Sequence, residues 1–192
     1  SCVELGIKNL TLYVFSVDNW KRPKSEVNAL MKLLLRSVKN EIDDINKNNI
    51  RMRIIGSIDK LSKSVKNELI DASNLTIKND GLNLNLAISY GSKTEIIDAF
   101  KQIIGKVKKN IISIENIDEK LINDHLYTKN SKDVDILIRT GGEFRLSNFL
   151  LWQNSYAELL FYEMLWPDFR KKDFYDSILT FQKRNRRFGK TN

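Results

Sequence analysis

The stretch Leu10-Thr11-Leu12-Tyr13-Val14-Phe15 decides the fold, together with the helix that Pro23 opens after it. A short run of apolar, β-branched and aromatic residues is typical of a buried parallel strand. Proline is tolerated in the first turn of a helix because its missing N–H has no partner there in any case. Apolar residues then recur every three or four positions and predict one buried helix face, at Val27, Leu30, Met31, Leu34, Val38, Ile42 and Ile45.

The same alternation of strand and helix continues along the chain. Further strands are expected at 51–55, 82–88, 134–138 and 159–162, and further helices at 60–78, 94–107, 117–126 and 172–184. Such alternation predicts right-handed βαβ units and a parallel sheet covered on both faces. We therefore expect an α/β fold.

Composition is that of a soluble globular chain with a basic balance. Hydrophobic residues make up 42% and the net charge is +8. The excess favours an anionic partner such as a phosphorylated small molecule, an acidic membrane or nucleic acid, although lysines scattered over helices also form ordinary solvated faces. Nucleic acid is not expected as a partner, because the sequence contains no base-reading motif. The single cysteine, Cys2, excludes an internal disulfide, and no apolar run reaches the roughly 18 residues that a membrane span needs. We expect a soluble or peripherally membrane-associated protein and leave its compartment open.

Small, polar and glycine residues follow the predicted strands. In parallel sheets, ligands bind beyond the carboxyl ends of the strands. Those ends read Ser16-Val17-Asp18-Asn19, Gly56-Ser57, Ser89-Tyr90-Gly91 and Arg139-Thr140-Gly141-Gly142. Such residues suit a phosphate-binding rim, but any loop that turns between strand and helix also favours them, and the pattern alone leaves both interpretations open.

The segment from Asp135 to Phe149 indicates an anion site. A strand delivers Arg139 to its end, two glycines allow a ligand close to the backbone, and Arg145 and Ser147 follow. Two guanidiniums and a hydroxyl suit a diphosphate, because arginine binds phosphate oxygens in a bidentate manner. The alternative is a structural ion pair between Arg139 and Glu143.

Glu158 is a carboxylate among apolar residues, so it needs a partner. That partner is either an arginine or a divalent metal that shares the diphosphate, since Mg²⁺ prefers carboxylate and phosphate oxygens.

The segment between Phe15 and Pro23 leaves the first strand at the same rim. Ser16 and Asn19 can form hydrogen bonds and Arg22 can meet an anion, while Trp20 offers apolar surface. The alternative is a plain helix entry with Trp20 in the core.

Taken together, these stretches resemble the cis-prenyltransferases, the family of undecaprenyl diphosphate synthase and dehydrodolichyl diphosphate synthase. The resemblance covers nearly the whole chain and rests on Glu4–Ser16, Asn19–Pro23, Leu84–Gly91, Leu137–Glu143, Arg145–Gln153, Tyr156–Glu158, Leu165–Phe169 and Phe181–Gly189. It implies a central, mostly parallel six-stranded sheet flanked by helices.

The resemblance also implies an activity and a set of site residues. The enzyme would condense isopentenyl diphosphate with an allylic diphosphate, such as farnesyl diphosphate, into a long-chain polyprenyl diphosphate. Asn19 would take part in removing the proton, Glu158 would ligate Mg²⁺, and the residues in contact with substrate would be Ser16, Val17, Asp18, Trp20, Arg22, Arg139, Glu143, Arg145, Leu146 and Ser147. The growing chain would need a tunnel between the sheet and the long helix led by Val27, Leu30, Met31 and Leu34. A homodimer formed through the C-terminal half and a membrane-associated product are also implied.

The sequence departs from the family pattern in several places. The family's Met-Asp-Gly-Asn stretch, which carries a metal-binding aspartate, is absent and would precede Ser1. We therefore expect residues 1–192 to form one domain that lacks its N-terminal strand and aspartate loop. Ser92-Lys93 replaces a Gly-Arg pair, Val17-Asp18 replaces a Ser/Thr-Glu pair, and His125 is expected on a helix surface. The alternative function is a non-catalytic subunit of a heteromeric enzyme; such subunits lose the Asn-Trp-x-Arg and Arg-Thr-Gly-Gly-Glu residues that this chain keeps at 19–22 and 139–143.

Overall fold

A computed structural model describes residues 1–129 and 131–184. The chain divides into two compact units, Ser1–Lys132 and Asp133–Asn192, and each is described by itself. The last part of the stretch that resembles the family at Phe181–Gly189 lies outside the described residues, from residue 185 on. The expectation of one domain over the whole chain stays a prediction.

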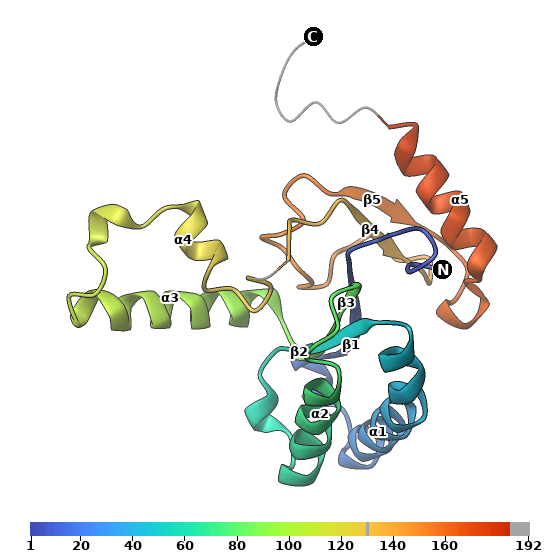
Figure 1. Cartoon of the computed structure of the whole chain (residues 1–192), viewed down its shortest axis with the longest axis horizontal. Helices are drawn as coiled ribbons and strands as arrows, with labels where there is room; N and C mark the ends of the chain where they lie inside the picture. The colour runs from blue at the N-terminus through green and yellow to red at the C-terminus, as the bar shows by residue number, and fades with distance from the viewer. Residues whose placement is uncertain (130, 185–192) are drawn as a thin grey trace. The chain divides into compact units, whose positions relative to one another are not determined.

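The first unit is built on a parallel sheet in which β3 (Leu82–Tyr90) is the central strand. It pairs with β1 (Asn9–Ser16) on one side and with β2 (Ile50–Ile55) on the other (Figure 1). The predicted α/β class with parallel strands is therefore confirmed. The three carboxyl ends of these strands meet at one edge of the sheet.

Helices α1 (Lys24–Lys47) and α2 (Lys63–Leu75) lie side by side over one face of this sheet (Figure 1). The alternation of leucine and asparagine in β3 explains the arrangement, because successive side chains of a strand point to opposite faces. Leu86 and Ile88 join the core beneath the helices, whereas Asn85 is buried on the other face and donates to Thr11 Oγ1 at 3.2 Å. The core under the helices contains Phe15, Val27, Met31, Leu34, Val38, Met52, Leu61, Val65, Leu69, Ala72, Leu86 and Ile88.

Three 3-10 turns and two further helices complete the described part of the first unit. The turns are η1 (Val17–Lys21), η2 (Ile58–Lys60) and η3 (Ile114–Asn116), and the helices are α3 (Ser92–Lys108) and α4 (Glu119–Asn123). The prediction that His125 lies on a helix surface is wrong, because the side chain is 7% exposed and follows the end of α4. Its Nδ1 lies 2.7 Å from the Leu121 carbonyl oxygen and its Nε2 lies 2.7 Å from Lys106 Nζ of α3. The chain folds back onto α3 here, and that reversal buries the ring.

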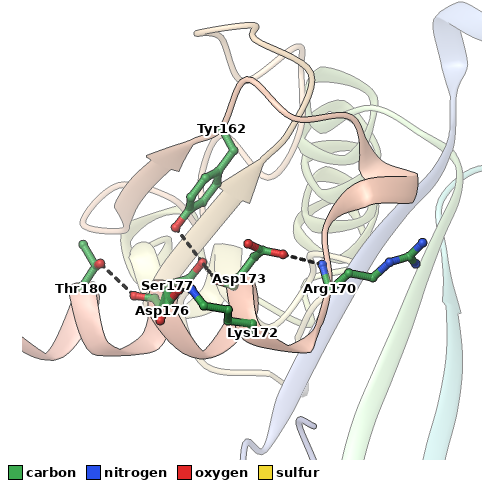
Figure 2. A network of polar contacts seen from close by, with 7 residues as sticks. All are labelled: Tyr162, Arg170, Lys172, Asp173, Asp176, Ser177 and Thr180. Atoms are coloured by element: carbon green, nitrogen blue, oxygen red, sulfur yellow. Dashed lines mark hydrogen bonds and ion pairs between the residues drawn. The ribbon is translucent and has the colours of Figure 1, made fainter.

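The second unit contains a parallel pair of strands, β4 (Ile136–Arg139) and β5 (Glu158–Phe161), the turn η4 (Trp166–Asp168) and helix α5 (Lys171–Gln182). Figure 2 shows how α5 is tied to the chain that follows β5, with the Tyr162 hydroxyl 2.8 Å from the hydroxyl of the fully buried Ser177. The Asp173 carboxylate accepts the Arg170 backbone N–H at 2.8 Å and caps the helix.

The described residues form one sheet of three strands and one of two, rather than a single sheet of six strands. Both sheets are parallel, as expected. Across the described ranges, none of the helices combines the length and the apolarity that a bilayer crossing requires.

Candidate active site

The end of β4 brings Arg139, Arg145 and Ser147 together. One terminal nitrogen of Arg139, Nη1, donates to the Arg145 carbonyl oxygen and, at 2.8 Å, to the Ser147 hydroxyl. Arg139 thus holds the following loop through Nη1 alone, although its guanidinium has five N–H donors in all. Gly141 and Gly142 shape the turn between them at φ 92° and 71°, a backbone region that suits glycine. The structure thus brings the Arg139 guanidinium to the Ser147 hydroxyl and to the backbone of Arg145. That the two guanidiniums and the hydroxyl form one diphosphate site stays a prediction.

Glu143 forms its ion pair with Arg145, through Nη1 and Oε2. The alternative from the sequence, a structural pair between Glu143 and Arg139, is not what the structure shows. Both partners of the observed pair are well exposed, at 61% for Arg145 and 46% for Glu143, so the pair contributes little to stability. The local charge is two guanidiniums against one carboxylate.

The loop after Arg145 has an unusual backbone. Ser147, Asn148 and Leu150 have φ values of 48°, 61° and 47°, a region in which non-glycine residues are rare and strained. Leu150 is buried and anchors the loop, while Leu146 accepts the Phe149 backbone N–H at 3.1 Å. Clustered strain of this kind is found preferentially at ligand sites.

Glu158, the first residue of β5, lies in an ion pair with Arg184 at 2.7 Å. The carboxylate is half-buried, 23% exposed, and the arginine is 39% exposed. Of the two partners left open by the sequence, the structure shows the arginine. Within residues 1–129 and 131–184, no group of three or more histidine, cysteine or acidic side chains is placed to hold a metal ion by itself. A single carboxylate still fits Mg²⁺ that arrives with a diphosphate, because Mg²⁺ keeps several waters and needs only one or two carboxylates besides the phosphates.

Ser16 and Asn19 form a reciprocal capping box at the end of β1. The Ser16 hydroxyl accepts the Asn19 backbone N–H at 3.2 Å, and Asn19 Oδ1 accepts the Ser16 backbone N–H at 2.8 Å. This exchange fixes the orientation of the Asn19 amide and commits its oxygen as an acceptor. The amide nitrogen is therefore the end that can serve a ligand, as a donor.

The rest of η1 is anchored by Trp20. Its ring meets Phe15 edge to face at 5.1 Å between centroids, and its Nε1 donates to the Ser89 hydroxyl at 2.9 Å. The side chain packs partly against the core, so the two sequence interpretations of Trp20 are compatible.

The charged residues around η1 lie in exposed local ion pairs. Asp18 pairs with Lys21 at 2.8 Å and raises the pKa of that lysine, and Arg22 pairs with Glu26 at 2.8 Å. Val17 opens the turn between Ser16 and Asp18. The structure thus groups the predicted residues as 16–22 in the first unit and 139–158 in the second.

An apolar cavity of about 360 Å³ lies between the sheet and α1. Leu30, Met31 and Leu34 of the predicted tunnel line it, whereas Val27 does not. Fourteen residues surround it: Leu12, Val14, Phe15, Leu30, Met31, Leu33, Leu34, Ser37, Val38, Glu41, Ile45, Met52, Leu84 and Leu86. Its volume lies within the range of small-molecule sites, about 300 to 1,000 Å³.

Sequence reasoning missed a buried polar cluster behind the strand ends. The Glu95 carboxylate, 0% exposed, accepts from the Tyr90 hydroxyl and, at 2.8 Å, from the Tyr127 backbone N–H. The Tyr127 hydroxyl donates to Asp98, and burial is the main reason why the pKa of Tyr127 is strongly raised. The signal available in the sequence was an acidic residue on the buried face of an expected helix.

Comparison with known proteins places this geometry in a family. Residues 1–189 match the family model described as "Putative undecaprenyl diphosphate synthase". The chain belongs to this family. The isoprenyl transferase of Chlorobaculum tepidum is 47% identical over 98% of this chain and 71% of its own length. The ditrans,polycis-undecaprenyl-diphosphate synthase of Haemophilus influenzae, named as specific for (2E,6E)-farnesyl diphosphate, is 47% identical over 98% of this chain and 79% of its own length.

Solved structures agree with the family. Lavandulyl diphosphate synthase from Lavandula x intermedia, in complex with dimethylallyl diphosphate, superimposes with a TM-score of 0.95 at 34% identity, over 98% of this chain and 81% of that one. A probable undecaprenyl diphosphate synthase from Campylobacter jejuni gives 0.88 at 41% identity, over 98% and 86%. The predicted enzyme class, a cis-prenyltransferase, is confirmed, and these relatives do not support the alternative of a non-catalytic subunit.

Proposed function

We propose that this prenyltransferase condenses isopentenyl diphosphate with an allylic diphosphate and releases a longer polyprenyl diphosphate. The allylic carbon–oxygen bond breaks and its electron pair leaves with pyrophosphate. The double bond of isopentenyl diphosphate supplies the electrons of the new carbon–carbon bond. Loss of a proton then creates the new cis double bond. The observation that carries this proposal is the contact of the Arg139 guanidinium, at the end of β4, with the Ser147 hydroxyl and the Arg145 carbonyl oxygen.

The diphosphate of isopentenyl diphosphate would bind to these three residues. Arg139 uses Nη1 to hold the loop and can donate from its other guanidinium nitrogens to phosphate oxygens. Arg145 can do so once a phosphate competes with its exposed pair to Glu143. Leu146 lies between Arg145 and Ser147 in the sequence, and its backbone would contact the substrate.

Glu158 would hold Mg²⁺, together with phosphate oxygens, in exchange for its pair with Arg184. A bound Mg²⁺ supplies Lewis-acid stabilisation of the departing pyrophosphate. Arg139 and Arg145 would neutralise the same developing charge directly, which is worth most where water is excluded.

The first unit would supply the residues around the condensing carbon atoms. Ser16, Val17, Asp18, Trp20 and Arg22 would contact substrate, and Asn19 would assist proton removal. Because the Asn19 oxygen is committed to Ser16, we propose that its amide nitrogen donates to the group that accepts the proton.

The cavity beneath α1 would receive the apolar chain. Burial contributes about 0.8 kcal/mol per CH₂, so each five-carbon unit that enters would contribute on the order of 4 kcal/mol. This supports chain elongation to a long, membrane-associated product.

A homodimer is part of the proposal. Helix α3 exposes Ile97, Phe100 and Ile104, 53%, 46% and 49% accessible, at a spacing of three and four residues. That spacing is typical of a helix–helix seam, and a second copy of this chain could cover it with the same surface. Phe100→Glu should then shift sedimenting dimer to monomer.

The six-stranded sheet and the single domain over residues 1–192 stay predictions that the family resemblance implies. The experiment that tests the function is incubation of the protein, with any upstream segment restored, with radiolabelled isopentenyl diphosphate, farnesyl diphosphate and Mg²⁺. Label should appear in long apolar products. Intact protein that forms no product longer than the primer would refute the proposal.

A further inference from the structure

Ser89 connects the ends of all three strands in the first unit. It lies at the end of β3, is fully buried and has a φ of 50°. Its hydroxyl accepts from Trp20 Nε1 at 2.9 Å, and its carbonyl oxygen accepts the Ser57 backbone N–H at 3.1 Å. Trp20 follows β1 and Ser57 follows β2, so one residue joins both flanking strand ends to the central strand.

The close approach at this point is built into the backbone. Gly56 has a φ of 122°, and a Cβ atom there would lie 2.1 Å from the Ile88 carbonyl oxygen. Only glycine therefore lets the end of β2 reach β3 beside Ser89. The strand ends form a tight junction, with the Ser89 hydroxyl directed to Trp20.

The junction matters for the turn that bears Asn19. None of the five residues of η1 is buried, and of these five it is Trp20 whose side chain packs against the core under α1. Its attachments include the Trp20 ring on Phe15 and the Trp20 hydrogen bond to Ser89. Asn19 precedes Trp20 directly, and the capping box with Ser16 fixes its amide relative to the turn. The position of the turn on the sheet therefore sets the position of the Asn19 amide.

We propose that Ser89 is a positioning residue for proton removal, because its hydrogen bond to Trp20 holds the turn that bears Asn19. The inference rests on the proposed role of Asn19 and extends it to a buried residue that itself contacts no substrate. A displaced amide would slow the step in which the proton leaves, whereas the proposed diphosphate contacts of Arg139, Arg145 and Ser147 lie outside this turn.

The test uses Ser89→Gly, which removes the hydroxyl and leaves a residue suited to positive φ. We expect kcat to fall about tenfold while the KM for isopentenyl diphosphate, whose diphosphate is proposed to bind Arg139, Arg145 and Ser147, stays within about twofold. Isopentenyl diphosphate deuterated at the carbon that loses the proton should show a larger kinetic isotope effect in the variant. Trp20→Phe removes the donor, and in a double-mutant cycle the combined variant should be no slower than the slower single variant.

Thr76→Val is the matched control. Thr76 is also 0% exposed, and its hydroxyl accepts the Met52 backbone N–H at 3.0 Å, away from the strand ends. This variant should lose stability but keep kcat and the isotope effect.

Asn19→Ala separates the inference from the function on which it rests. If Asn19→Ala keeps full kcat, the role proposed for Asn19 is wrong and the inference falls with it. If Asn19→Ala slows the enzyme while Ser89→Gly keeps the wild-type kcat and isotope effect, the inference alone is overturned.

Discussion

Replacing Arg139 by alanine should weaken the use of isopentenyl diphosphate far more than it weakens the fold. The side chain makes two hydrogen bonds, to the Arg145 carbonyl oxygen and the Ser147 hydroxyl, in a solvent-accessible loop. Truncation of one partner of a buried, hydrogen-bonded charge pair at a binding site costs about 2 to 5 kcal/mol. At about 1.4 kcal/mol per tenfold, this range corresponds to about 30-fold to 4,000-fold in kcat/KM. Because Arg139 is half-buried, we expect the lower part of that range, about 30-fold to 300-fold.

Two further variants separate ligand binding from loop tethering. Arg139→Lys keeps the charge but loses the planar fork, and it should recover only about tenfold of the loss. Ser147→Gly removes one of the two tethers and keeps a residue suited to the φ of 48°. It should cost less than Arg139→Ala, because the guanidinium remains.

The assay is incorporation of radiolabelled isopentenyl diphosphate at varied concentration, with thermal unfolding measured in parallel. Arg36→Ala is the control, since Arg36 is exposed on α1 and should change neither quantity. The reasoning is refuted if Arg139→Ala keeps the wild-type KM, or if Ser147→Gly reproduces the whole effect, because Arg139 would then act on the loop alone.

Three further predictions concern the metal, the cavity and a buried phenol. Glu158→Gln should raise the Mg²⁺ concentration needed for half-maximal activity at least about tenfold. It should lower the free energy of unfolding by less than about 1 kcal/mol, because the pair with Arg184 is partly exposed. An unchanged Mg²⁺ titration would contradict this prediction. Leu34→Trp should fill part of the cavity and shorten the products seen by chromatography, whereas Leu75→Trp, at a position 64% exposed on α2, should not; equal product lengths in the two variants would speak against a chain site there. The pKa of Tyr127 is raised because the folded protein favours the protonated phenol over the phenolate. The phenol therefore contributes its full stability below about pH 10, the ordinary pKa of tyrosine in the unfolded chain, and this contribution is lost as the pH rises further. The difference in Tm between wild type and Tyr127→Phe should therefore shrink above that pH, and a difference that grows would have the wrong sign.

The elements of the fold were predictable because their signals are local. The apolar run at 10–15 became β1 (Asn9–Ser16), and the leucine–asparagine alternation became β3 (Leu82–Tyr90). A short run of apolar side chains is enough to predict a buried strand. Apolar residues that recur every three or four positions predict the buried face of a helix. The number of strands in one sheet depends on pairing between distant segments, and there the expectation of six strands exceeded the three and two that the described residues form.

The side-chain partners in the site were less predictable for the same reason. Glu143 pairs with Arg145 rather than with Arg139, and this depends on the backbone angles of Gly141 and Gly142, which the sequence does not determine. The burial of His125 depends on a reversal of the chain after α4, which brings the ring to Lys106. Glu158 was expected to have a partner, but the choice of Arg184 is a contact across 26 residues.

In each unit a serine at positive φ accepts a hydrogen bond from a side chain of the proposed site near a strand end. Ser89 and Ser147 have φ values of 50° and 48°, and the hydroxyl of each accepts from a long side chain, Trp20 in one unit and Arg139 in the other. Glycine would adopt this backbone without the roughly 1 to 2 kcal/mol that other residues incur, but it offers no acceptor. Threonine offers the acceptor, but its branched Cβ fits positive φ poorly. Serine is thus the smallest residue that supplies a hydroxyl at this conformation, and the hydrogen bond offsets the strain. Backbone strain of this kind clusters at functional sites, which agrees with the proposed roles of Trp20 and Arg139 in substrate binding.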